Sequence, residues 1–237
     1  MRTEKVDTKK ENKKKEKITV KSYIRDFLLF IDKNIIKTIG ILAIVAVLLF
    51  ALSIQPMVKV ALTAECEGAC RDGVTLISEY WSKIQVLFVT AFAGIVPYIY
   101  APVVGFIGYV LSEASSLAYI IKGYGYGLGI VMGIVPLLLN VVTICIVTAL
   151  GIYICRTVTV GYRMSSVKNM NFMNFKIKLY EAMQKENKVK ELETKKEKKL
   201  EKLQAKKQKI NYLQLLNTGI LVCIIQFISV LIQQILL

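Results

Sequence analysis

Positive charge is segregated along this chain. Of its 32 Lys and Arg residues, 28 fall in residues 1–37 and 156–209, and the rest of the chain is largely apolar. Cytoplasmic loops of membrane proteins retain Lys and Arg, so both basic stretches are predicted to lie on the inner side of one bilayer. A soluble domain of 237 residues would instead intersperse its charges around one core. The sequence therefore predicts an all-α, polytopic membrane helix bundle with about five transmembrane helices and its N-terminus inside.

Composition disfavours two classes of function. The formal net charge of +15 coexists with 54% apolar residues, and the basic residues flank apolar tracts. This pattern favours contact with anionic lipid headgroups over nucleic-acid binding. The chain has no His and shows no paired membrane acids, nucleophile motif or metal-ligand cluster. We therefore expect no enzymatic activity, no cofactor and no metal site.

The first apolar tract predicts a retained membrane anchor. Residues 1–37 form a basic cytoplasmic arm, and residues 38–54 form a first span at the short end of the spanning range. A cleaved signal peptide is excluded because a long Lys-rich arm precedes the tract and no cleavage site follows it. Apolar residues recur at helical spacing between Val20 and Ile35. They indicate either an interfacial amphipathic helix or an extension of the first span.

Residues 55–83 are predicted to form an external loop. This interval is polar and slightly acidic, which places it opposite the basic stretches. It contains Cys66 and Cys70, which could form a disulfide in an oxidising compartment or stay as reduced thiols. Two cysteines without any His cannot fill a tetrahedral metal site.

Residues 84–155 are predicted to form a three-helix membrane core. The chain is apolar for 38 residues from Ile84 to Ile121 apart from two prolines and Glu113, which is enough for two helices divided at Ala101-Pro102. A partly re-entrant hairpin is the alternative. A Gly-rich turn at residues 122–129 leads to a third span at about 130–155. That turn lacks the strand and βαβ frame of nucleotide-binding loops.

Two polar residues and several glycines are notable inside this core. Glu113 and Asn140 are candidate intramembrane polar residues. An acid at a helix centre costs about 2.5–3.5 kcal/mol on insertion scales, so Glu113 should face the bundle or an interface. Asn140 is predicted to form an interhelical hydrogen bond. Small residues allow close helix approach, and the predicted helix-packing positions are Gly94, Gly105, Gly108, Gly133 and Gly151.

The remaining chain is a second basic segment and a last span. Residues 156–210 carry 16 Lys and Arg against six Glu, and from Lys178 onwards the composition favours a long charged helix. The segment is interpreted either as a binding surface for anionic lipids or a partner, or as a solvated linker. Residues 211–237 form the fifth predicted span and would place the C-terminus outside.

The stretch GIVPLLLNVVTICIVTALGIYICR combines Pro136, Ala149-Leu150-Gly151 and Arg156 in one predicted helix. In these residues it matches the third helix of the stage II sporulation protein M family of bacterial membrane proteins, and residues 80–158 resemble the conserved core of that family. It departs at Leu137, where His is usual, and at Asn140, where Glu is usual. A role that depends on those two groups is therefore not implied for this chain.

The resemblance implies a multi-pass protein of the bacterial cell membrane, and the distribution of Lys and Arg with the predicted spans places its N-terminus in the cytoplasm and its C-terminus outside. It implies a non-enzymatic scaffold that recruits or organises other membrane or cell-wall proteins in sporulation engulfment or wall remodelling. The implied partners are the sporulation peptidoglycan-degrading proteins D and P. The alternative is a permease, export or immunity component, as in circular bacteriocin systems. That role would require solvent or ion access to Glu113, whereas a scaffold would not.

Overall fold

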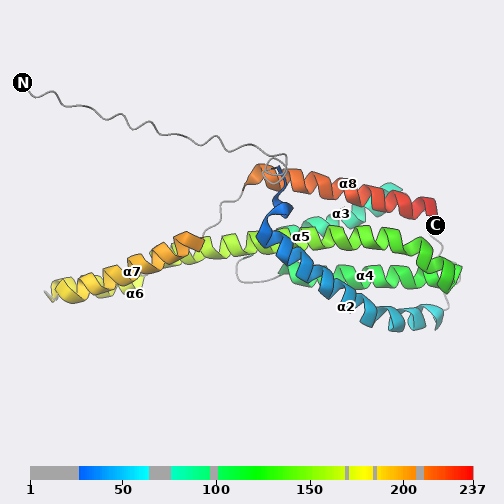
Figure 1. Cartoon of the computed structure of the whole chain (residues 1–237). Coiled ribbons are helices and arrows are strands. Elements are labelled where there is room, and N and C mark those ends of the chain that lie inside the picture. Colours follow the sequence, from blue (N-terminus) through cyan, green and yellow to red (C-terminus); the bar gives the residue numbers. More distant parts are fainter. Residues whose placement is uncertain are drawn as a thin grey trace, which may run out of the picture.

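The protein is a helical bundle from which a helical arm extends. The computed structural model describes residues 27–63, 76–96, 101–168, 171–183, 186–206 and 211–236, and no strand occurs among them. Its long helices are α2 (Lys33–Thr63), α3 (Leu76–Phe92), α4 (Ala101–Tyr124), α5 (Tyr126–Lys168), α6 (Asn171–Ala182), α7 (Glu186–Lys206) and α8 (Tyr212–Leu236). Two short 3₁₀ helices, η1 (Leu29–Ile31) and η2 (Ala93–Ile95), flank α2 and α3. In Figure 1 the bundle contains α2, α3, α4, α8 and the first part of α5. The last part of α5, with α6 and α7, extends from one end of the bundle, and these helices are called the arm below.

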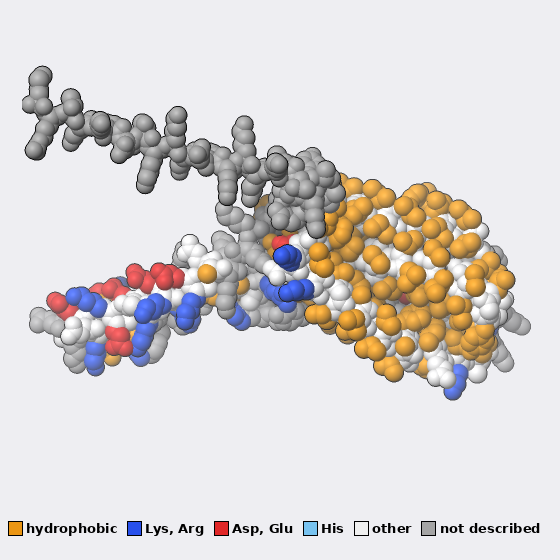
Figure 2. Space-filling model, in the orientation of Figure 1, with side chains coloured by type: hydrophobic (Ala, Val, Ile, Leu, Met, Phe, Trp, Pro, Cys, Tyr) orange, Lys and Arg blue, Asp and Glu red, His pale blue; other side chains and the backbone are white. Residues whose placement is uncertain are grey.

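Four of the described helices, α2, α4, α5 and α8, are long and apolar enough to cross a membrane. Apolar side chains cover the bundle surface in Figure 2, whereas charged side chains cover the arm. The sequence predicted about five spans. The fifth long helix of the bundle, α3, is not among these four. Its 17 described residues correspond to about 26 Å of helix, slightly less than a hydrocarbon core of about 30 Å.

Helix α5 is the central element of the bundle. It packs against α2, α3, α4 and α8. Every residue from 143 to 153 is buried, which fits a helix that is apolar on all sides. The main core cluster includes Ile144, Val147 and Leu150 of α5 together with Phe106 of α4 and Val222 of α8.

The predicted first span, 38–54, is too short. Helix α2 continues through Pro56 to Thr63. A proline removes one backbone hydrogen bond but is tolerated where neighbouring helices support the chain. Here Val58 and Ala61 are buried against Leu117 and Ala118 of α4, and this packing holds the last turns of α2.

The predicted loop 55–83 also has wrong boundaries, because helices occupy residues 55–63 and 76–83. Helix α3 begins before Lys83 and ends at Phe92, short of the predicted end near residue 100. Cys66 and Cys70 lie outside the described residues. So do residues 20–26 of the predicted amphipathic helix, and α2 itself begins only at Lys33.

The predicted Gly-rich turn is much tighter than residues 122–129. Helix α4 ends at Tyr124 and α5 begins at Tyr126, so Gly125 alone joins them. Gly125 has a φ of 78°, and its N–H donates to the carbonyl of Ile121 at 2.8 Å. A left-handed glycine after the last helical residue is a common C-terminal cap, and it folds α5 back along α4.

The third helix of the predicted membrane core, about residues 130–155, does not end at Arg156. Helix α5 runs on to Lys168 and leaves the bundle as the base of the arm. Helix α7 packs back against both α5 and α6. Its half-buried positions Val189, Leu192, Leu200 and Leu203 form one helical stripe. The described part of residues 156–210 is therefore mostly helical, as the prediction of a long charged helix requires.

The predicted packing glycines separate into two groups. A Cβ on Gly94 would lie 2.8 Å from the carbonyl carbon of Gly151 and closer still to its oxygen, so η2 and α5 meet backbone to backbone. A Cβ on Gly105 would lie 2.5 Å from the Thr90 hydroxyl, and one on Gly133 would collide with the Leu117 side chain. Gly108 has nothing within 4 Å of its Cβ position, so its prediction as a packing residue is wrong.

These contacts predict different effects for two Gly→Ala substitutions. Gly94→Ala should destabilise the bundle by about 1–3 kcal/mol, because the new methyl group must displace the α5 backbone. Gly108→Ala is the matched control, since its methyl group enters open space and favours the helix. The unfolding temperature of both variants in detergent micelles measures the difference. Equal temperatures would contradict the close approach of η2 and α5.

Candidate functional site

Polar side chains from four helices meet inside the apolar bundle. Lys83 comes from α3, Glu113 from α4, Asn140 from α5, and Gln226 and Ser229 from α8. We call these five residues the polar network. Asn140, Gln226 and Ser229 are 0% exposed and Glu113 is 6% exposed, whereas the Lys83 side chain is 15% exposed, so the network is buried except at its lysine.

The charged part of the network is an ion pair. Lys83 Nζ lies 3.2 Å from Glu113 Oε1, and it also donates a hydrogen bond of 3.2 Å to Gln233 Oε1 on α8. The second carboxylate oxygen, Oε2, accepts a 2.8 Å hydrogen bond from Asn140 Nδ2. Both oxygens of Glu113 therefore have partners, as a buried carboxylate requires.

Asn140 connects the ion pair to α8. Its Oδ1 accepts hydrogen bonds from Ser229 Oγ at 2.6 Å and from Gln226 Nε2 at 3.1 Å. Ser229 Oγ also lies 3.1 Å from the Pro136 carbonyl, one turn earlier on α5, so one hydroxyl proton serves two acceptors. At the edge of the network, Tyr109 donates a long bond of 3.5 Å to Gln226 Oε1.

Little space remains beside the network. A cavity of about 10 Å³ adjoins Glu113, Gly133 and Gln233, at the lower limit of the volume that one water molecule occupies. The carboxylate is held by a cation and an amide, so the arrangement is suited to joining helices. Among the described residues, no group of three or more Cys, Asp or Glu side chains could hold a metal ion.

The two polar residues singled out from the sequence are in direct contact. Glu113 faces the bundle and not an interface, and Asn140 bonds between helices as predicted. The sequence prediction missed Lys83, which it assigned to an external loop. Periodicity could have indicated the α8 residues, because Gln226, Ser229 and Gln233 are three and four positions apart and share one helix face. Cys145 and Cys155 are buried in α5, where a free thiol packs as a small apolar side chain.

No protein-family model, curated protein or solved structure matches this chain. The resemblance to the stage II sporulation protein M family therefore stays a prediction from the sequence.

The ion pair predicts strong energetic coupling between Lys83 and Glu113. Either Lys83→Gln or Glu113→Gln alone leaves a buried charge without its partner and should cost about 3–5 kcal/mol. The double substitution should cost less than the sum of the two, because it removes both charges. A double-mutant cycle on the unfolding free energy in micelles measures the coupling.

The control cycle uses Glu191 and Lys195, an exposed ion pair four residues apart on α7. Lys195 lowers the pKa of the Glu191 carboxyl by hydrogen bonding and charge, yet solvent screens such a pair. Its cycle should show a much weaker coupling than the cycle of the buried pair. Additive effects of Lys83→Gln and Glu113→Gln would show that the buried pair does not hold α3 and α4 together.

Proposed function

We propose that this protein is a non-enzymatic membrane scaffold that presents a basic helical arm to partner proteins. The observation that carries the proposal is the continuity of α5. Residues 143–153 of this helix are buried in the bundle, and the same helix continues to Lys168 as the base of the arm (Figure 1). Helix α7 packs against α5, so the arm is in contact with a helix that is itself part of the bundle. A partner bound to the arm would be held at a defined position relative to the membrane.

The polar network supports a structural role for the bundle. A transported solute or ion needs an accessible polar group, whereas the Glu113 oxygens bond to Lys83 and Asn140. The adjoining cavity of about 10 Å³ is too small for a solute larger than water. These features favour the scaffold over the permease or export alternative.

The arm carries a surface suited to a protein partner. Phe175, Leu179 and Met183 follow one another at four-residue spacing along and just beyond α6, and their side chains are 62%, 45% and 50% exposed. We call these three residues the α6 stripe. Lys178 is exposed beside it, and residues 156–209 carry 16 Lys and Arg against six Glu. An amphipathic helix with acidic flanks has the chemistry to bind this surface.

The proposal includes the expectations from the family resemblance. The protein would lie in a bacterial cell membrane with its N-terminus and arm in the cytoplasm and its C-terminus outside. Its partners would be membrane or cell-wall proteins of sporulation engulfment or wall remodelling, with the peptidoglycan-degrading proteins D and P as the first candidates.

Partner capture by variants of the intact protein tests the scaffold. The protein is purified from its host membrane after crosslinking, and the proteins that accompany it are quantified by mass spectrometry. Phe175→Ser combined with Leu179→Ser should lower partner recovery at least about tenfold, as expected for loss of central apolar anchors. Lys178→Ser, on the same helix, should leave recovery within about twofold of the wild type because charges at an interface rim contribute little.

A second variant separates the scaffold from a transporter. Lys83→Gln combined with Glu113→Gln removes the buried charges and keeps hydrogen-bonding groups. At equal amounts of folded protein, this variant should retain partner capture and biological activity. Loss of activity with unchanged partner capture would contradict the scaffold. Recovery of an ATPase subunit or a bacteriocin precursor in place of wall hydrolases would favour the export alternative.

A further inference from the structure

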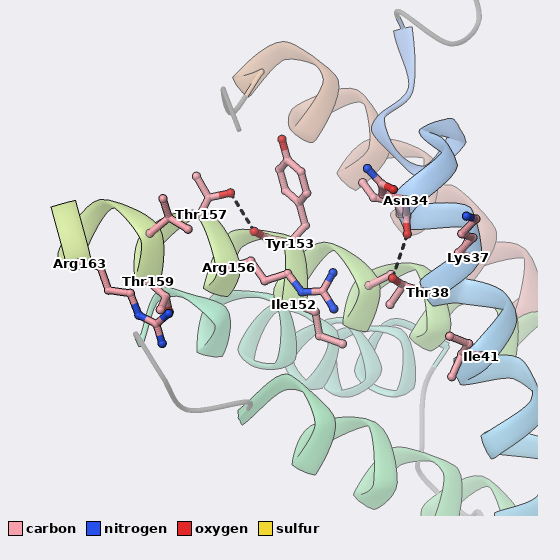
Figure 3. Close-up of a pocket in the computed structure, with 13 residues that line it drawn as sticks. Asn34, Lys37, Thr38, Ile41, Ile152, Tyr153, Arg156, Thr157, Thr159 and Arg163 are labelled. Carbon is pink, nitrogen blue, oxygen red and sulfur yellow. Dashed lines mark hydrogen bonds between the residues drawn. The ribbon is translucent and has the colours of Figure 1, made fainter. Parts of the chain in front are cut away.

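A large cavity lies where α5 leaves the bundle. Its volume is about 710 Å³, and it is lined by the first turns of α2 and by residues 149–163 of α5. Figure 3 shows Lys37 and Thr38 on α2 opposite Arg156 on α5, with the Arg156 side chain extending into the space between the two helices. Arg163 lies two turns further along α5.

The cavity wall is cationic. Lys37, Arg156 and Arg163 line it, and none of the described residues that line it is acidic. Two of its hydroxyls already donate to their own helices, Thr38 to the Asn34 carbonyl and Thr157 to the Tyr153 carbonyl, both at 3.0 Å. The Lys37 ammonium and the Arg156 guanidinium supply charged donors at this wall. Guanidinium and ammonium groups are the side chains that bind phosphate most readily.

Part of the wall is apolar, formed by Ile35, Ile41, Ala149, Ile152 and Val160, and the uncharged polar part is formed by Asn34 and four hydroxyl residues. The cavity thus joins a cationic region to an apolar region. It also lies at the transition from the apolar surface of the bundle to the charged arm (Figure 2). In a membrane protein this is the depth of the lipid headgroups.

We infer that this cavity binds the phosphate group of an anionic phospholipid, with Lys37 and Arg156 as the residues that recognise it. Free inorganic phosphate carries the same anionic group and could make the same contacts with Lys37 and Arg156. The lipid is favoured because Ile41, one turn after Lys37 on α2, lines the cavity and is also 63% exposed on the surface that acyl chains would cover. This inference stands independently of the scaffold proposal, since a transporter could bind the same lipid.

Lipid binding by the purified full-length protein tests the inference. The affinity for phosphatidylglycerol and for phosphatidylcholine is measured by native mass spectrometry or by titration in detergent. Lys37→Gln combined with Arg156→Gln should weaken phosphatidylglycerol binding at least about tenfold, because each cation near an anionic lipid contributes roughly fivefold. Phosphatidylcholine binding should stay unchanged.

Lys59→Gln is the matched control. Lys59 lies on the same helix as Lys37, is exposed, and is near the opposite end of α2. Its substitution removes one positive charge, where the double variant removes two, and should leave phosphatidylglycerol binding within about twofold, because screening limits the reach of exposed charges. Wild-type binding by the Lys37→Gln/Arg156→Gln variant would overturn the site, as would an equal loss with Lys59→Gln. Displacement of the lipid by millimolar inorganic phosphate at constant ionic strength would overturn the lipid as the source.

Discussion

Burying a lysine and a glutamate in an apolar bundle costs least where the two side chains meet. Each charge alone costs about 2.5–3.5 kcal/mol at a membrane helix centre, and their contact offsets much of that cost. Lys83 and Glu113 lie on α3 and α4, so the pair restricts how these two helices rotate against each other. Asn140 then bonds to the carboxylate and to Ser229, which ties α5 and α8 to the same point. Interhelical hydrogen bonds in membranes are individually weak, at about 0.6 kcal/mol on average, so the charged pair gives this network its main directional constraint.

The network also depends on close backbone packing. Asn140 reaches Glu113 with a short side chain, which requires α4 and α5 to lie close together. The one-residue connection at Gly125 aligns these helices from their shared end. At the other end, the contact between Gly94 and Gly151 brings η2 against α5. Small residues thus allow the helix backbones to approach closely, and this close approach lets the polar side chains form hydrogen bonds between helices.

Much of the helical content followed from apolar tract length, but the helix ends and polar partners depended on tertiary contacts. Glu113 and Asn140 were predicted to be important because polar groups are rare in apolar segments. Lys83 was missed since a lysine beside an apolar tract normally marks its boundary, and only the position of Glu113 makes it an interior residue. The passage of α2 through Pro56 likewise depends on burial of Val58 against α4. These contacts join residues that are distant in sequence, so local composition cannot predict them.

Helix α5 contains polar groups in two different settings. Asn140 lies at its buried part with its side-chain oxygen and nitrogen both bonded to other helices. Arg156, 16 residues later, lies about 24 Å further along the axis, at a wall with no acidic residue among those described. A polar group within apolar packing must find its partner in the protein, whereas a cation at the bundle end can take one from water or lipid. Helix α5 therefore contains a buried polar region, whose groups bond within the protein, and a cationic region at the end of the bundle, whose groups can bind ligands. A ligand can bind the cationic region without disturbing the hydrogen bonds that hold the bundle together.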